Sequence, residues 1–128
     1  VLLVEDNEVN QFVARGHLEK MGCSVVLATN GQEALDVLEE HYDEDGGSIF
    51  DVILMDCQMP VLDGYEATEI ILRREKEMER LHVPIIALTA AARKEDKDRC
   101  LDVGMDDFIV KPFSRDGLFQ TLKKHVKE

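Results

Sequence analysis

The sequence predicts a single α/β domain over residues 1–128, a doubly wound parallel sheet of five strands in the order 2-1-3-4-5. Five short apolar runs recur along the chain, and a helical pattern follows each of them. The runs do not alternate apolar with polar residues, so we expect helices to bury both faces of the sheet. A length of 128 residues suits one domain and leaves no room for two.

The predicted strands and helices alternate along the whole chain. The strands are the apolar runs Val1–Val4, Val25–Ala28, Val52–Met55, Ile85–Leu88 and Phe108–Val110. The helices are predicted over Glu8–Met21, Gln32–His41, Tyr65–Arg80, Lys94–Val103 and Arg115–Lys127. Asn7 and Ser114 are suited to cap the N-termini of the first and fifth helices. Gly22 and Gly104 are suited to end the first and the fourth. The acidic segment Tyr42–Ser48 is predicted to be a surface loop.

The charge balance excludes two classes of partner. Fifteen Lys and Arg residues against 27 Asp and Glu give a net charge of −12. Because binding to a phosphate backbone needs a cationic surface, we expect no direct contact with nucleic acid. An anionic membrane surface is disfavoured for the same reason. The longest apolar run, Val83–Ala92, is far shorter than the ~20 residues of a membrane-spanning helix.

The cysteines indicate the cellular location of the chain, and its first residue indicates a longer parent. The three cysteines form no C-x-x-C pair, which is typical of a reduced cytoplasmic protein without structural zinc: Cys23, Cys57 and Cys100. No initiator Met is present, so we expect a piece of a longer parent chain, which leaves open a membrane anchor elsewhere in the parent. The isolated domain is expected to be a monomer.

Histidines and a charged run are predicted to have structural or solvated roles. The four histidines share no spacing that would suit a metal site: His17, His41, His82 and His125. The run Arg73–Arg80 is predicted to be the solvated face of the third helix.

Polar residues follow four of the five predicted strands. Glu5 and Asp6 follow the first strand, and Asp56 follows the third. Thr89 follows the fourth strand and Lys111 the fifth. In an open parallel sheet, ligands bind beyond the carboxyl ends of the strands, close to the point where the strand order reverses. We therefore expect these five side chains to converge on one edge of the sheet.

The charges of this edge predict a divalent cation. Glu5, Asp6 and Asp56 carry three negative charges, and Lys111 adds one positive charge. Two like charges cost about 4 kcal/mol at roughly 4 Å and an effective dielectric near 20. Mg2+ suits the site better than Ca2+, because magnesium takes one or two carboxylates, keeps waters and shares phosphate oxygens. With the metal in place, the Asp56 carboxylate can attack a phosphoryl donor, while Lys111 and Thr89 stabilise the phosphoryl oxygens.

Four segments of the chain carry recognisable motifs: Val1–Asn7 (VLLVEDN), Leu54–Pro60 (LMDCQMP) with Asp63-Gly64, Ala87–Ala90 (ALTA) and Val110–Phe113 (VKPF). Together they resemble response-regulator receiver domains, which have a flavodoxin-like fold. The motifs occur in order and at the expected intervals over essentially the whole chain. Asn7 and the segment Asp56–Pro60 are more similar to receivers of hybrid sensor histidine kinases than to those fused to DNA-binding domains.

The resemblance implies a role for each matching residue. Asp56 is the phosphoacceptor, and Thr89 and Lys111 contact the phosphoryl group. The implied Mg2+ ligands are the carboxylates of Asp6 and Asp56, the backbone carbonyl of Gln58 and, through water, Glu5. Phe108 occupies the position of the switch aromatic, paired with Thr89, and the Lys111–Pro112 peptide bond is expected to be cis. Glu5 departs from many receivers, which carry Asp at that position.

The resemblance also implies a function and partners. The chain is expected to accept a phosphoryl group from a phosphohistidine onto Asp56 in a Mg2+-dependent reaction, and to change conformation. Its partner is a histidine kinase or a histidine-phosphotransfer protein, and the parent chain can itself be a histidine kinase. We expect a regulatory phosphoacceptor that promotes its own phosphorylation and dephosphorylation, rather than an enzyme with a separate substrate.

Other functions of the same fold class fit the sequence less well. An FMN site needs a Ser/Thr- and Gly-rich first loop, where this chain is acidic. A dinucleotide site needs G-x-G-x-x-G after the first strand. A phosphatase with an aspartate nucleophile typically carries a second acid two residues later, where this chain has Gln58. The remaining alternative is an interaction domain of the same fold that is not phosphorylated.

The first predicted helix presents a second apolar face. At 100° per residue, one stripe is predicted to face the core: Asn10, Val13, Ala14, His17, Leu18 and Met21. Val9, Phe12 and Gly16 fall on a different side. An exposed apolar patch close to the reactive edge is typical of a docking site. In similar receivers the first helix packs against the bundle that presents the phosphohistidine. The alternative is that Phe12 covers a neighbouring helix.

Overall fold

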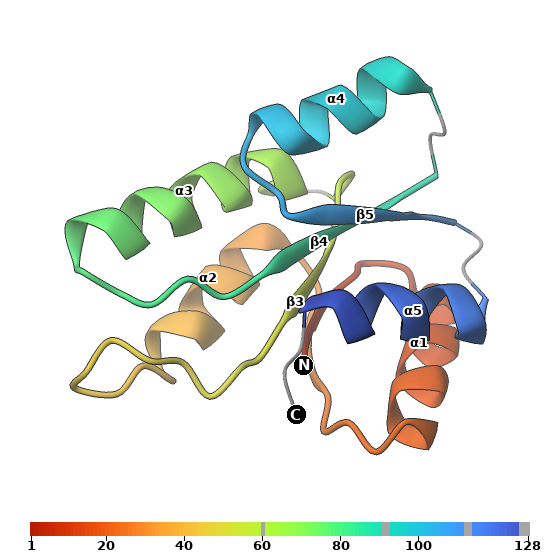
Figure 1. Cartoon of the computed structure of the whole chain (residues 1–128), viewed down its shortest axis with the longest axis horizontal. Coiled ribbons are helices and arrows are strands. Elements are labelled where there is room, and N and C mark those ends of the chain that lie inside the picture. The colour runs from red at the N-terminus through yellow and green to blue at the C-terminus, as the bar shows by residue number, and fades with distance from the viewer. Residues whose placement is uncertain (60, 91–92, 112–113, 126–128) are drawn as a thin grey trace.

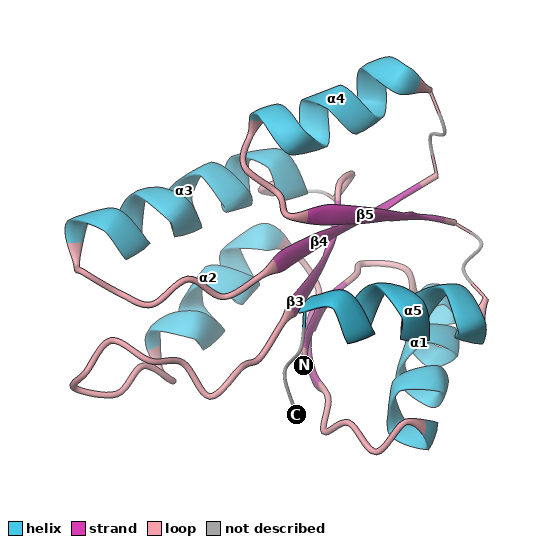
Figure 2. Cartoon of the chain, in the orientation of Figure 1, coloured by secondary structure: helices cyan, strands magenta, loops and turns pink. Residues whose placement is uncertain are grey.

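The computed structural model describes residues 1–59, 61–90, 93–111 and 114–125. Within these residues, five strands alternate with five helices (Figure 2). The strands are β1 (Leu2–Val4), β2 (Val26–Ala28), β3 (Ile53–Asp56), β4 (Ile85–Thr89) and β5 (Asp107–Val110). The helices are α1 (Glu8–Lys20), α2 (Gly31–Glu39), α3 (Gly64–Glu77), α4 (Lys94–Asp102) and α5 (Arg115–His125). None of the helices within this part of the chain is both long and apolar enough to cross a membrane.

The strands form one parallel sheet in the order β2-β1-β3-β4-β5, which confirms the predicted fold class and strand order. β1 lies between β2 and β3, so the chain order reverses next to β1. The register brings Val4 opposite Met55 and Asp56 opposite Leu88. The carboxyl ends of β1, β3 and β4 therefore reach the same edge of the sheet.

Two hydrophobic cores lie on opposite faces of this sheet. Successive strand residues point to opposite faces, so Leu2 and Val4 join one core and Leu3 joins the other. The first core packs under α2, α3 and α4, and the second packs under α1 and α5 (Figure 1). The three central strands are thus fixed from both sides, which holds the residues at their ends in place.

The outer strands depart from the prediction that both faces of every strand are buried. β1, β3 and β4 are buried along their whole length, whereas Val26 in β2 is 37% exposed. In β5 only Ile109 is buried. Each outer strand has one neighbouring strand, and the helices cover the middle of the sheet more completely than its margins. Apolar composition alone does not distinguish a central strand from an outer one.

Most predicted helix boundaries and caps agree with the structure within three residues. The Asn7 side chain accepts a hydrogen bond from the Asn10 N–H at 3.0 Å, and Ser114 Oγ accepts one from the Gly117 N–H at 3.0 Å. Gly22 and Gly104 follow their helices with φ of +85° and +102°, values that favour glycine. The Lys111–Pro112 bond and the predicted end of the fifth helix at Lys127 lie outside the described residues.

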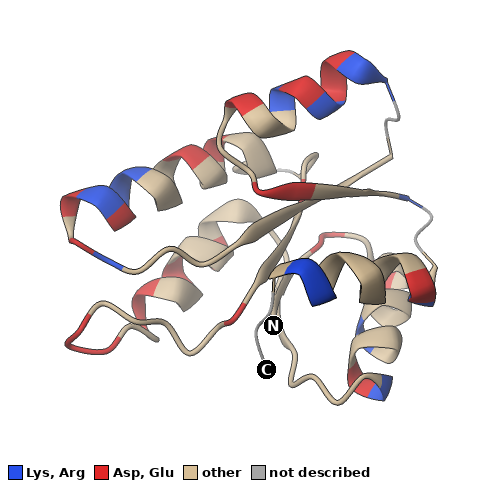
Figure 3. Cartoon of the chain, in the orientation of Figure 1, with Lys and Arg blue, Asp and Glu red and all other residues tan. Residues whose placement is uncertain are grey.

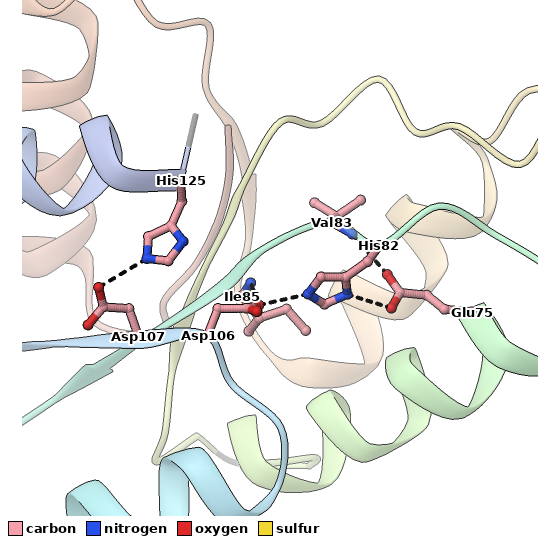
Figure 4. A network of polar contacts seen from close by, with 7 residues as sticks. All are labelled: Glu75, His82, Val83, Ile85, Asp106, Asp107 and His125. Atoms are coloured by element: carbon pink, nitrogen blue, oxygen red, sulfur yellow. Dashed lines mark hydrogen bonds and ion pairs between the residues drawn. The ribbon is translucent and has the colours of Figure 1, made fainter. Parts of the chain in front are cut away.

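The charged run that ends α3 is not simply a solvated face. Basic and acidic residues lie side by side in the C-terminal half of α3 (Figure 3), but Glu75 is buried. Its Oε1 lies 2.7 Å from His82 Nδ1, and its Oε2 accepts the Val83 N–H at 3.0 Å. His82 Nε2 lies 2.8 Å from Oδ2 of Asp106, which also accepts the Ile85 N–H at 2.8 Å (Figure 4). His82 thereby joins α3 to the turn between α4 and β5.

This network makes the stability of the domain depend on pH. Burial alone would lower the pKa of His82, but the hydrogen bonds and charges of Glu75 and Asp106 outweigh it and raise the pKa above 6.5. Only the imidazolium can donate to both carboxylates, so this stabilisation is complete below pH 6.5 and is lost as the pH rises through the raised pKa. Because the side chain is partly exposed, we expect a contribution below about 1 kcal/mol. Urea unfolding of the wild type and His82→Gln from pH 5.5 to 8.5 measures it. The two free energies should converge at high pH, and a constant difference would contradict the assignment.

Candidate functional site

Five polar side chains meet in one cleft at the carboxyl edge of the sheet. Glu5 and Asp6 follow β1, Asp56 and Thr89 end β3 and β4, and Lys111 follows β5. All five line a cleft of about 500 Å³. The other lining residues are Asn7, Asn10, Cys57, Gln58 and Ala90. The predicted convergence of the five side chains is present in the structure.

Three carboxylates of this cleft form a candidate cation site. Glu5, Asp6 and Asp56 each offer an oxygen, and these oxygens lie within 4.8 Å of one another. Glu5 and Asp56 are buried, while Asp6 is exposed to solvent. Oxygen ligands, negative charge and access to water match the preference of Mg2+, which usually keeps several waters beside one or two carboxylates. The donor set therefore fits magnesium.

Lys111 lies between two of the carboxylates. Its Nζ donates to Glu5 Oε2 at 2.9 Å and lies 3.3 Å from Asp56 Oδ2. The backbone fixes the start of this side chain, because the Lys111 N–H donates to the Thr89 carbonyl at 2.7 Å. The ammonium thus neutralises part of the acidic cluster from the side of β5.

The pKa values of Asp56 and Lys111 reflect this shared contact. Burial and the charge of Glu5 raise the pKa of Asp56 to about 6, although Lys111 and the Gln58 N–H, 3.2 Å from Asp56 Oδ1, oppose the change. Burial disfavours the Lys111 ammonium, but its hydrogen bond to Glu5 and the charge of Asp56 outweigh burial and raise its pKa. One ammonium does not balance the buried acids, and a divalent cation would supply the missing positive charge.

Gly64 allows the N-terminus of α3 to pack against the end of β3. Its N–H donates to the Cys57 carbonyl at 3.1 Å. A Cβ at this position would overlap the Asp56 carbonyl oxygen and lie 3.0 Å from the Cys57 Cα. Asp63 caps the helix by accepting the Glu66 N–H at 2.9 Å. In the sequence, Gly64 is visible only as part of the receiver-like motif, and the close backbone contact explains why the position suits glycine.

Asn10 is a residue of the cleft that sequence reasoning missed. It was predicted to face the core, but its Nδ2 donates to Glu5 Oε1 at 3.1 Å and its side chain lines the cleft. The next residue, Gln11, donates from Nε2 to the Glu5 carbonyl at 2.7 Å. An amide three residues after the N-cap Asn7 is the signal that could have indicated this contact.

Phe108 lies in β5, opposite Ala87 of β4. Its side chain is half-buried against the core beneath α2, α3 and α4. Lys97 of α4 places its Nζ 5.1 Å from the centre of the Phe108 ring. Thr89, its proposed partner in a switch, is buried two residues along β4 from Ala87.

The exposed side of α1 carries an apolar patch of Val9, Phe12 and Gly16, called the α1 patch below. Val9 is 70% exposed and Phe12 is 82% exposed. The alternative that Phe12 covers a neighbouring helix is therefore wrong. On the predicted core-facing stripe, Ala14 and Leu18 are buried, but Val13 is 39% exposed, so the prediction is wrong for Val13.

Comparison with known proteins identifies the family. The model of the response regulator receiver domain matches residues 1–123. The chain therefore belongs to the response regulator receiver domain family. Histidine kinase 1 of Arabidopsis thaliana is 43% identical over 99% of this chain. The chain spans 13% of the length of that relative.

Solved structures support the same assignment. The receiver domain of a sensor histidine kinase from Pseudomonas aeruginosa PAO1, with a magnesium ion coordinated in its active-site cleft, is 44% identical. Its TM-score is 0.82, over 97% of this chain and 93% of that one. The receiver domain of a Saccharomyces cerevisiae response regulator, in complex with a histidine phosphotransfer protein, is 36% identical, with a TM-score of 0.84 over 98% and 86% of the two chains.

Proposed function

We propose that this receiver domain accepts a phosphoryl group from a phosphohistidine onto Asp56 in a Mg2+-dependent reaction. The observation that carries the proposal is the position of Asp56, buried in the cleft beside the carboxylates of Glu5 and Asp6 and within 3.3 Å of the Lys111 ammonium. An interaction domain without phosphorylation would not need this assembled set of charges, so the geometry favours a phosphoacceptor.

In the proposed reaction, a carboxylate oxygen of Asp56 forms a bond to phosphorus while the bond from phosphorus to the histidine nitrogen breaks. The transition state is loose, so catalysis consists mainly of placing positive charge and donors around the phosphoryl oxygens. Lys111 and Thr89 are proposed to contact these oxygens. Asp6, Asp56 and the Gln58 carbonyl are proposed to hold Mg2+, with Glu5 acting through water. Magnesium would supply charge neutralisation at the phosphoryl group.

Acetyl phosphate tests this proposal without a protein donor. Intact-mass spectrometry should show one added phosphoryl group in the presence of Mg2+ and none after addition of EDTA. The Asp56→Asn variant should remain unlabelled, because its amide cannot form the acyl phosphate. Undiminished labelling of this variant at another residue would refute the assignment.

Phosphorylation is proposed to act through Thr89 and Phe108. If Thr89 moves toward the phosphoryl group, it leaves space that the half-buried Phe108 ring can enter. Phe108 has no hydroxyl group, so packing alone would drive this movement. The change would reshape the surface of α4 and β5, where Lys97 lies over the ring.

The proposed phosphodonor is a histidine kinase or a histidine-phosphotransfer protein. The yeast complex supports the second kind of partner, because a receiver domain of the same fold binds such a protein there. The α1 patch is proposed as the docking surface, since Phe12 and Val9 are exposed at the helix that begins beside the cleft. Free cysteines at positions 23, 57 and 100 support a cytoplasmic location for the domain.

Phe12→Asp is expected to slow phosphotransfer from the cognate protein donor by at least about tenfold, because a charge replaces an apolar contact at the centre of the patch. Labelling by acetyl phosphate should be unchanged, since Phe12 does not line the cleft. Leu101→Asp, at a half-exposed leucine on α4, is the matched control and should transfer at the wild-type rate. Equal loss of both activities in Phe12→Asp would contradict the docking role.

A further inference from the structure

The carboxylate of Glu5 is held by three donors. Its Oε1 accepts the Asn10 side-chain amide at 3.1 Å and the Asn7 backbone N–H at 3.3 Å. Its Oε2 accepts the Lys111 ammonium at 2.9 Å. Only 1% of Glu5 is exposed, so its orientation depends on these protein contacts rather than on bulk water.

The two oxygens of the Glu5 carboxylate have donors of different kinds. Lys111 also contacts Asp56 at 3.3 Å, so its position depends on what happens at the proposed phosphoacceptor. The Asn10 amide is neutral and donates to Glu5 from α1. When Lys111 turns toward a phosphoryl group, Oε2 loses a donor, while Asn10 and Asn7 still hold Oε1.

The first turn of α1 fixes Asn10 for this contact. The Asn7 side chain caps the helix by accepting the Asn10 backbone N–H at 3.0 Å. Gln11 donates to the main-chain carbonyl of Glu5 at 2.7 Å and does not contact its carboxylate. The cap therefore fixes the backbone of Asn10, and the Asn10 side-chain amide can orient Glu5 without adding a charge that would compete with a cation.

We infer that Asn10 is a positioning residue for the magnesium site: it holds Glu5 through Oε1 and so keeps Oε2 directed at the cleft. The inference rests on the proposed function of the cleft. It also accounts for glutamate at position 5, because a carboxylate one methylene further from the backbone reaches the Asn10 amide. A shorter aspartate would leave this amide out of hydrogen-bond range.

Titration with Mg2+ alone tests the inference without phosphorylation. We expect Asn10→Ala to raise the Mg2+ dissociation constant roughly tenfold, measured from amide chemical shifts around Asp6 and Asp56, as for other residues that orient a metal ligand. Gln11→Ala removes a contact to Glu5 but not to its carboxylate, and should change the constant less than about twofold. Asn10→Gln keeps the amide and should retain most of the affinity.

The decisive comparison uses the Glu5→Asp background. In that background, Asn10→Ala should change the Mg2+ dissociation constant less than about twofold, since the shorter carboxylate no longer contacts the residue at position 10. The inference is overturned if Asn10→Ala lowers Mg2+ affinity equally in both backgrounds. It is also overturned if Asn10→Ala does not lower the affinity in the chain that keeps Glu5. Alanine favours helices, so Asn10→Ala should fold, and its thermal transition verifies this. Failure of acetyl phosphate to label the wild type would refute the proposed function separately, because the titration does not require that reaction.

Discussion

Replacing Lys111 with alanine is expected to slow labelling by acetyl phosphate roughly 100-fold, the usual effect of removing one preorganised group that stabilises developing charge. The ammonium already lies 3.3 Å from Asp56 Oδ2, on the side where the phosphoryl oxygens would form. Removing it leaves those oxygens without this counter-charge. Initial rates of labelling at saturating Mg2+ measure the effect.

The same variant should bind Mg2+ at least as tightly as the wild type. In the wild type, the Lys111 ammonium partly neutralises Glu5 and Asp56, so removing it leaves the acidic cluster more negative. Lys123→Ala is the matched control, because this exposed lysine lies on α5 outside the cleft. A parallel loss of Mg2+ affinity and labelling in Lys111→Ala would mean that Lys111 acts mainly by holding the carboxylates.

Gly64→Ala is expected to lower the free energy of unfolding by about 1 to 3 kcal/mol, the range seen when a closely packed region must admit an extra group. The new Cβ would overlap the Asp56 carbonyl oxygen. The obstructing atom belongs to the backbone, so α3 or the end of β3 must move. Such a movement displaces Asp56 and should also slow labelling.

Gly16→Ala provides the matched control for this experiment. A Cβ at Gly16 meets no atom within 4 Å, and the residue lies inside α1. Alanine should therefore raise the free energy of unfolding by about 0.5 to 1 kcal/mol through helix propensity. Urea unfolding monitored by circular dichroism compares the two variants. Equal stability of Gly64→Ala and the wild type would show that the chain relaxes at no cost.

The sheet and the convergence of the cleft could be predicted because they depend on local patterns. Central strands are continuous apolar runs, and polar residues such as Asp56 and Thr89 come where each run ends. Parallel pairing then brings those ends together. The exposure of β2 and β5 was not predictable in this way, since a residue such as Val26 has the same composition signal in a central or an outer strand.

Contacts of single side chains were harder to predict. The helical stripe predicts that Asn10 faces the core, but Asn10 lies in the first turn of α1, where it lines the cleft and contacts Glu5. Glu75 belongs to a charged run, yet it is buried because His82 and the Val83 N–H approach it from another segment. Such pairings depend on how distant parts of the chain meet, which periodicity does not describe.

The ion pair that Lys111 makes with Glu5 and Asp56 means that the polypeptide supplies its own counter-charge at the cleft. In a zinc finger, by contrast, the metal supplies the folding energy and chelation unfolds the chain. Here two continuous hydrophobic cores and a built-in ammonium maintain the architecture. We therefore expect magnesium to act as an exchangeable co-reactant, whose removal stops phosphorylation reversibly and leaves the domain folded.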